Sequence, residues 1–295
     1  MPSLSAARYG KDNVRVYKVH RDEKTGVHTV TEMTVCALVE GDIETSYTKA
    51  DNSVVVATDS IKNTIYIKAK EFPVNPPELF AAKLGQHFLD KYAHLSVAHI
   101  DIKVHRWTRM VIDGEPHPHS FWRDGEETRN VSADISREGI TIRSGIRDLT
   151  VLKSTGSAFH GFVRDEFTTL PEVWDRIMST DVDSTWTWKK FNNLAEVEEG
   201  VERFNKTYET ARNIVFKVFA IDDSASVQAT MYRMCEQILE AAPEVDKVAF
   251  SLPNKHYFEI DLSWHKGIKN TGKDAEVYMP FPGPNGLIKC EVSRS

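Results

Sequence analysis

The order in which strands and helices are predicted along the chain constrains the fold most, because the same order occurs twice. In the first half, alternation, cap and helical-periodicity signals predict strands over 8–20 and 28–40, helices near Thr58 and Pro76-Pro77, and strands over 94–110 and 117–135. The order starts again near residue 145, with strands at 149–152 and 185–188, helices over 196–220 and from Ser224, and strands at 247–252, 257–262 and 287–292. We therefore expect an α+β protein with antiparallel sheets and helices on one face, divided into two tandem domains at residues 1–142 and 143–295.

The composition excludes several classes of partner and cofactor. The net charge is −6 with both signs mixed along the chain, which gives no basic surface for nucleic acid or an anionic membrane. No apolar run is long enough for a signal peptide or a membrane span, so we expect an intracellular soluble protein. The three cysteines, Cys36, Cys235 and Cys290, are far apart in sequence and lie among apolar neighbours, which favours buried free thiols over a zinc or iron–sulfur site.

The stretch 251–262 places two polar side chains where the buried face of a strand begins. Alternation from residue 257 puts one apolar set on that face: Phe258, Ile260 and Leu262. Asn254 and His256 share this parity, so the pleat directs them to the same side. Pro253 has no N–H for a central ladder and indicates the strand entrance. A hydrogen-bonded core His and a turn Asn are the alternative interpretation.

Two predicted helix starts are candidate sites for an anion. Thr58-Asp59-Ser60 opens a helix in the first half, and the run from Ser224 to Gln228 opens one in the second. The first N–H groups of a helix lack internal partners and carry partial positive charge, so the backbone N–H groups of Asp59 and Val227 suit an anionic ligand. Ordinary capped helices explain the same residues.

Phe159 and Arg176 are candidates for holding a flat ligand. Phe159 lies in an irregular run flanked by Gly156 and Gly161, where an aromatic face can be presented; a core Phe is the alternative. The planar guanidinium of Arg176 matches two adjacent acceptors of a heterocycle or carboxylate. Asp175 stands beside it, so a surface ion pair is the competing interpretation.

A metal site has little support in the sequence. His117-Pro118-His119 puts two imidazoles on one strand face, but no carboxylate or Cys stands at ligand spacing in that run. We expect no metal and no cofactor, since a Gly-rich dinucleotide fingerprint is also absent from the sequence.

Together these stretches closely resemble the urate oxidase (uricase) family, most of all its fungal members, over essentially the whole chain. The similar runs occur in order: Tyr9-Gly10-Lys11, Ala57-Thr58-Asp59-Ser60-Ile61-Lys62-Asn63-Thr64, Leu152-Lys153-Ser154-Thr155-Gly156-Ser157, Phe159-His160-Gly161-Phe162, Ser226-Val227-Gln228 and Leu252-Pro253-Asn254-Lys255-His256-Tyr257-Phe258. The resemblance implies two tandem copies of the tunnelling fold (T-fold) and a homotetramer whose sheets close into a barrel, with active sites at chain interfaces. It also implies oxidation of urate by O₂ and water to 5-hydroxyisourate and hydrogen peroxide, without metal or flavin.

The resemblance assigns the substrate clamp to five residues. Phe159 is expected to stack on the purine, Arg176 to grip its pyrimidine edge with two N–H donors, and the Gln228 amide to pair with the opposite edge. The N–H groups of Val227 and Asp59 complete the clamp in the plane of the ring.

The resemblance assigns the chemistry to four further residues. Lys11, Thr58 and His256 form the expected catalytic relay that removes and returns protons, with Thr58 also at the substrate, and Asn254 holds O₂ or water over the ring. Urate that has lost a second proton is electron-rich enough to reduce O₂, so deprotonation and positioning are the tasks of the protein.

Two alternatives use the same fold. A non-catalytic purine- or pterin-binding module keeps the clamp but needs no relay, and a metal-dependent pterin enzyme needs a His/Cys cluster. Family resemblance places the protein in the peroxisome, yet the chain ends Ser293-Arg294-Ser295 instead of a Ser-Lys-Leu-type signal. If the chain is complete, we expect it to be cytoplasmic.

Overall fold

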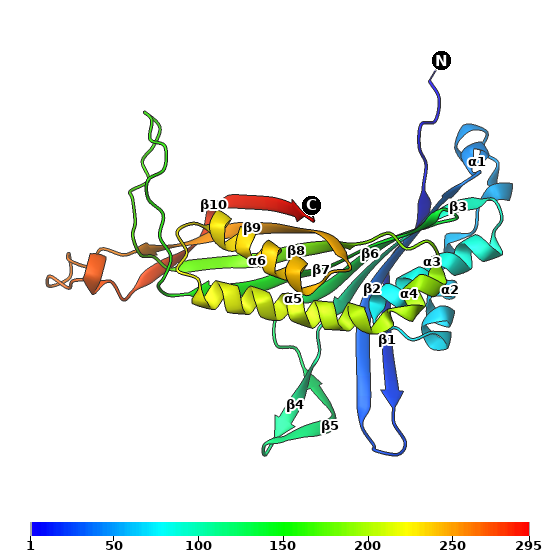
Figure 1. Cartoon of the computed structure of the whole chain (residues 1–295), viewed down its shortest axis with the longest axis horizontal. Coiled ribbons are helices and arrows are strands. Elements are labelled where there is room, and N and C mark those ends of the chain that lie inside the picture. The colour runs from blue at the N-terminus through cyan, green and yellow to red at the C-terminus, as the bar shows by residue number, and fades with distance from the viewer. Residues whose placement is uncertain (1, 295) are drawn as a thin grey trace.

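Eight antiparallel strands form one continuous sheet in the structure, a computed structural model that describes residues 2–294 (Figure 1). Their order across the sheet is β1-β2-β3-β6-β7-β8-β9-β10. The strands have these bounds: β1 Tyr9–Arg21, β2 His28–Gly41, β3 Leu95–His105, β6 Thr128–Ser136, β7 Gly139–Lys153, β8 Met178–Trp188, β9 Val245–Glu259 and β10 Tyr278–Ser293. The helices are α1 Glu44–Thr48, α2 Thr58–Glu71, α3 Pro77–Lys91, α4 Leu194–Glu199, α5 Val201–Ile221 and α6 Val227–Ala241, with short 3₁₀ turns at Asn52–Val54 and Gly272–Asp274. The predicted α+β class with antiparallel sheets is confirmed.

The repeated element order is also present in the structure, with nearly constant spacing. Helices α3 and α6 both have 15 residues and begin 150 residues apart, at Pro77 and Val227. A lysine binds the C-cap carbonyl of a helix in each half. Lys18 Nζ donates to Phe72 O after α2 at 2.8 Å, and Lys153 Nζ donates to Asp222 O after α5 at 2.7 Å. The predicted boundary between residues 142 and 143 falls within β7, and the division into two domains stays a prediction.

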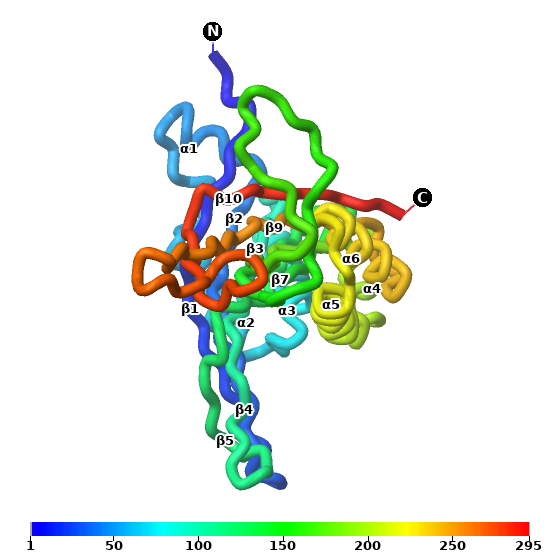
Figure 2. Tube along the Cα trace, turned by 90° about the vertical axis from the view of Figure 1, so that its left-hand side faces the viewer, coloured from blue at the N-terminus to red at the C-terminus, as the bar shows by residue number. Residues whose placement is uncertain are grey.

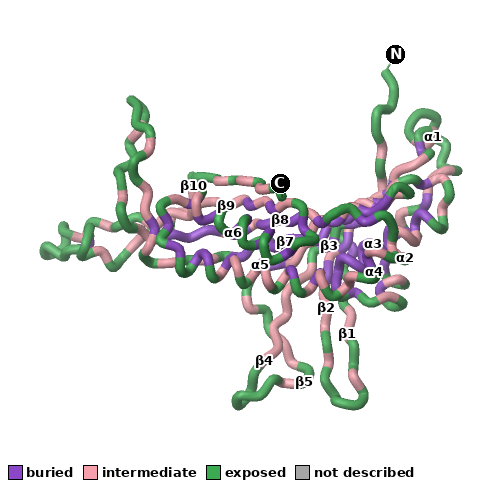
Figure 3. The backbone as a smooth tube through the Cα atoms, in the orientation of Figure 1, coloured by how far each residue is buried: buried purple, intermediate pink, exposed green. Residues whose placement is uncertain are grey.

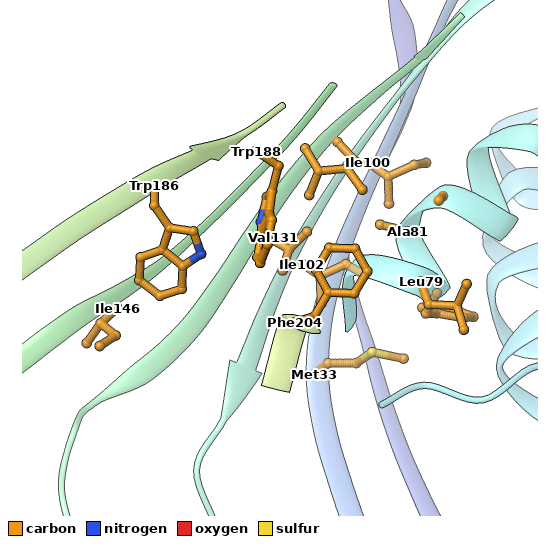
Figure 4. Packing of buried hydrophobic residues seen from close by; sticks show 14 of the residues in the cluster. Met33, Leu79, Ala81, Ile100, Ile102, Val131, Ile146, Trp186, Trp188 and Phe204 are labelled. Atoms are coloured by element: carbon orange, nitrogen blue, oxygen red, sulfur yellow. The ribbon is translucent and has the colours of Figure 1, made fainter. Parts of the chain in front are cut away.

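The core lies between the sheet and the helices on one of its faces (Figures 1 and 3). Strand β8 alternates so that Trp186 and Trp188 point inward and are fully buried. Trp188 meets Phe204 of α5 edge to face, with ring centroids 4.8 Å apart (Figure 4). Truncating such a buried aromatic to Ala costs about 3–5 kcal/mol, so this contact fixes α5 on the sheet.

A small second sheet projects downward in Figures 1 and 2, beside the hairpin of β1 and β2. It consists of β4 Thr108–Ile112 and β5 Glu115–Trp122, joined at Asp113-Gly114, where both residues have positive φ. The predicted turn is therefore confirmed, but the two long strands expected over 94–110 and 117–135 are each divided. None of the helices in residues 2–294 is long and hydrophobic enough to cross a membrane.

Three further expectations about single elements were wrong. The helix predicted over 196–220 is interrupted at Gly200, which separates α4 from α5. The helix expected to open at Thr58-Asp59-Ser60 does begin at Thr58, but these residues do not supply the expected N-cap, since Ala57 is the N-cap and no side chain caps the helix. Strand β9 runs through Pro253 to Glu259 instead of beginning at Pro253 and reaching Leu262, so Phe258 is 47% exposed. Pro253 is accommodated because the ladder to β8 skips that position.

Candidate active site

The long loop between β7 and β8 is tied to the first turn of α6. Ala158 N–H donates to Ser224 O at 2.7 Å, and Ser224 N–H donates back to Gly156 O at 3.0 Å. Gly156 has φ +74°, a conformation that glycine adopts without strain, and it turns the chain toward Phe159. Figure 2 shows the base of this loop (green) beside α6 (yellow). The loop therefore carries Phe159 to the N-terminus of the helix.

Arg176 lies at the other end of this loop, against the ring of Phe159. Its backbone N–H donates to Ser157 O at 2.8 Å, and its guanidinium carbon lies 5.3 Å from the Phe159 ring centroid. Among residues 2–294 no carboxylate lies within ion-pair distance of Arg176, and burial lowers the pKa of its guanidinium. The surface ion pair that the sequence allowed is therefore absent from the described chain. A partly buried, unpaired guanidinium beside an aromatic face suits a planar anion.

Asp175 holds the loop instead of neutralising its neighbour Arg176. Its carboxylate accepts hydrogen bonds from the Thr155 hydroxyl at 2.6 Å and from Gly156 N–H at 2.8 Å. These bonds hold the pKa of Asp175 below its ordinary value. Sequence reasoning missed this positioning role, because the donors Thr155 and Gly156 precede Asp175 by 20 and 19 residues and only the loop closure brings them together.

Asn254 and His256 lie near the C-terminal end of β9. They share the parity of Phe250 and Leu252, which are buried, but also that of Phe258, which is exposed, and both are themselves half-buried. That their side chains point to the buried side stays a prediction. Burial lowers the pKa of His256, and the positive charge of Arg176 lowers it further. The imidazole is therefore neutral near pH 7 and able to accept a proton.

The first turn of α6 follows Ser224, which is tied to the loop that carries Phe159, and the N–H groups of Val227 and Gln228 precede the first helical hydrogen bond. Ser226 is the N-cap, and its side chain accepts from Ala229 N–H at 3.2 Å. Val227 is buried while Gln228 is exposed, so the Gln228 amide is free to meet a ligand. Thr230 of the next turn donates to the buried Asp222 at 2.6 Å, which anchors the helix start. Sequence reasoning also missed Asp222, whose role depends on this tertiary contact.

Lys11, Thr58 and Asp59 form a second cluster in the first half. Lys11 precedes a register shift in β1 that lies between Lys11 and Val14, and Asn13 in this bulge has φ 56°. The hydrogen bond from Lys62 Nζ, 2.6 Å long, holds the pKa of Asp59 below its ordinary value, and the charge of Lys11 acts in the same direction. At the start of α2 the first helical bond is made by Ile61 N–H, which leaves Asp59 N–H for another acceptor.

The two clusters do not meet within one chain. Five strands separate β1, which carries Lys11, from β9, which carries Asn254 and His256. Neighbouring strands lie about 4.8 Å apart, so the six steps between β1 and β9 span roughly 29 Å along the sheet. Figure 1 shows α2 and the long loop before β8 at opposite ends of the molecule. The structure thus assembles two partial sites, one in each half.

One large cavity of the described chain is lined by neither cluster. That cavity, of about 630 Å³, lies on the helix-free sheet face and is lined by polar side chains that include Thr34, Lys103 and Arg143. Within residues 2–294 no three His, Cys, Asp or Glu side chains are arranged to hold a metal ion, and this includes the His117–His119 pair.

Comparison with known proteins gives consistent matches over the full length. A family model described as "Uricase" matches residues 7–134 and 142–289. The chain is 68% identical to the uricase of Emericella nidulans over 295 residues, which covers all of this chain and 98% of that protein. It is 67% identical to the uricase of Aspergillus flavus, again over all of this chain and 98% of the relative. The crystal structure of the Arthrobacter globiformis uricase superposes with a TM-score of 0.88 at 37% identity, covering 100% of this chain and 96% of that one.

Proposed function

Because the chain belongs to the uricase family and oxidises urate, we propose that it does so with O₂ as electron acceptor, without a cofactor, at a site divided between two chains. Urate, O₂ and water become 5-hydroxyisourate and hydrogen peroxide. Named uricases of 68% and 67% identity do not favour the alternative of a non-catalytic purine-binding module.

The second-half cluster holds the substrate. Urate stacks on Phe159, and Arg176 donates two parallel N–H bonds to one edge of its ring system. The Gln228 amide and Val227 N–H complete this side of the clamp at the positive end of α6. The unpaired guanidinium of Arg176 supports this assignment, because its charge is otherwise uncompensated in a partly buried position.

The first-half cluster and His256 move protons. Lys11, Thr58 and the neutral His256 remove a proton from urate, which raises its electron density until it reduces O₂. Asp59 N–H accommodates the charge that develops on the ring. Asn254, two residues before His256 on the same strand face, orients O₂ and then the water that adds to the oxidised ring. The electrons come from urate, so no redox group of the protein takes part.

The separation of the two clusters is the observation that carries the proposal. Strands β1 and β10 are the edges of the sheet and have ladder groups free to pair with another chain. Pairing edge to edge would bring Lys11 and Thr58 of one chain to the urate held by the second half of its neighbour. We propose a homotetramer closed in this way into a barrel.

Complementation between two inactive variants tests the shared site. Lys11→Met and Arg176→Ala should each be nearly inactive as homo-oligomers. An equal mixture refolded together should regain about one quarter of the wild-type sites, since each intact site takes one good half from each parent. Urate absorbance and peroxide release are followed together with a chelator present. Verified mixed oligomers without recovered activity would reject the shared site.

A further inference from the structure

Two thiols face each other between α6 and the edge strand β10. The Cys235 and Cys290 sulfur atoms lie 3.7 Å apart, and all three cysteines of the chain are free. Cys235 lies in the middle of α6 and is completely buried, whereas Cys290 is only partly buried. A bonded pair of sulfurs is about 2.05 Å apart, so a displacement of about 1.7 Å would join them.

We infer that Cys235 and Cys290 form an oxidative modification site, at which hydrogen peroxide closes a reversible disulfide between α6 and β10. The source of peroxide in turnover rests on the proposed function, whereas the thiol pair itself does not. The two cysteines are 55 residues apart, and the bond would close a loop over the segment between them. This segment contains Asn254 and His256.

Exposure assigns the order of the two steps. Cys290 is the more accessible thiol, so its sulfur attacks one peroxide oxygen, breaks the O–O bond and becomes a sulfenic acid as one water leaves. The Cys235 sulfur then attacks the sulfenic sulfur, forms the S–S bond and releases the second water with its own proton. Two thiols and one peroxide give one disulfide and two waters. Burial and the adjacent Cys290 raise the pKa of Cys235, which makes Cys235 the resolving partner and not the first nucleophile.

Cys36 provides an internal control on the same chain. It lies on β2 beside Asp12 and Asp101, and burial and these charges raise its pKa to about 11. No second thiol is within reach of Cys36 in residues 2–294. We therefore expect Cys36 to remain a thiol under conditions that oxidise the pair.

Peptide mapping after peroxide treatment tests the inference on the full-length protein. Purified enzyme is exposed to hydrogen peroxide without urate, alkylated and digested without reductant. The peptides of Cys235 and Cys290 should be linked, with a mass about 2 Da below the sum of the two, while Cys36 is alkylated. Since no turnover is needed, a failure here is independent of any failure of the proposed reaction. The Cys36→Ser variant should give the same linked peptides.

Two outcomes would overturn the inference. One is alkylation of both thiols after peroxide treatment; the other is Cys290 as sulfinic or sulfonic acid while Cys235 stays reduced. Cys290→Ser and Cys235→Ser should both abolish the link. If the serine at the buried position 235 disturbs folding, the Cys290→Ser variant still tests the inference, because Cys290 is only partly buried. The linked form should also unfold roughly 5–10 °C higher than the reduced form. Dithiothreitol should reverse that shift, and Cys290→Ser should not show it.

Discussion

Helices α3 and α6 occupy corresponding places in the two halves, but their first turns differ in charge and in burial. Their second residues are Glu78 and Gln228. The side chain of Glu78 is completely buried, and its carboxylate accepts from Arg129 at 2.7 Å and from the Ser144 hydroxyl at 2.6 Å. Gln228 is exposed, with its amide directed to no protein partner among the described hydrogen bonds of residues 2–294.

The strands behind these helices differ in the same way. Val104 and Arg106 precede Asn254 and His256 by the same 150 residues that separate the two helices. Arg106 forms ion pairs with Glu127 at 2.6 Å and Asp124 at 2.9 Å, so its charge is neutralised inside the chain. The first half thus has a buried, ion-paired carboxylate in the first turn of its helix α3, whereas the second half has an exposed amide at the corresponding position of α6. This difference agrees with the proposal that the first helix start serves stability and the second serves substrate binding.

The largest effect should come from breaking the buried ion pair between Glu78 and Arg129 in the first half. Arg129→Met leaves the Glu78 carboxylate buried without its cation, which should lower the free energy of unfolding by about 3–5 kcal/mol. Urea unfolding of the purified variant measures the loss. The double variant Glu78→Gln with Arg129→Met removes both charges and should recover part of it. Gln228→Ala, at the matching position, should change the unfolding free energy by less than about 0.5 kcal/mol. Equal losses in both helices would contradict the comparison.

Substitutions at the proposed site in the second half should change urate binding instead of stability. Arg176→Lys replaces a planar two-bond grip by a point charge, so urate affinity should fall roughly ten- to a hundredfold, or about 1.5–3 kcal/mol. Steady-state kinetics with urate measure it, and thermal unfolding should stay unchanged. Arg164→Lys is the matched control, because Arg164 belongs to the same loop and, among the hydrogen bonds of residues 2–294, donates to Leu170 O alone, at 2.8 Å on the exposed side. Unaltered affinity in Arg176→Lys would make Arg176 a structural residue.

A smaller effect separates turnover from binding on β9. Asn254→Ala should lower kcat about tenfold with little change in KM, since the proposed partner of Asn254 is O₂ or water and not urate. The corresponding first-half variant, Val104→Ala, removes a residue packed against the core and should affect stability alone. A rise in KM without a fall in kcat would assign Asn254 to the urate clamp.

Much of the frame could be predicted from sequence, because its signals are local. Helical periodicity predicted the helix from Pro76-Pro77, and the turn signal Asp113-Gly114 predicted the β4–β5 turn. The length of β9 could not be predicted, because Pro253 lies where the ladder to β8 omits a bond and this depends on the neighbouring strand. Gly200, in contrast, has low helix propensity, so the break between α4 and α5 does have a signal in the sequence.

In the candidate site, too, residues in recognisable motifs could be predicted from the sequence, whereas residues whose role depends on tertiary contacts could not. The side chains proposed to contact urate, such as Arg176 and His256, were assigned from motifs that resemble the uricase family, and their contact with the substrate stays a prediction. Sequence reasoning did not identify Asp175 or Asp222, which act by accepting bonds from groups that only the tertiary fold brings near. It also gave Arg176 an ion-pair alternative, which the binding of Asp175 to Thr155 removes.

The smallest effect concerns the pKa of His256, which depends on burial and on the charge of Arg176. Burial depresses the pKa of His256 first, and the charge of Arg176 depresses it further. The imidazole is thus neutral down to a lower pH than an ordinary histidine, and the acid limb of activity should lie below the ordinary histidine pKa. Arg176→Gln removes the charge but keeps a polar side chain, so the pKa of His256 should rise toward its ordinary value. NMR titration of the His256 ring measures this without urate and without turnover. Arg176→Lys, which retains a positive charge, should leave most of the depression in place. A His256 pKa that is the same in wild type and Arg176→Gln would show that burial alone sets it, and that the two residues are electrostatically independent.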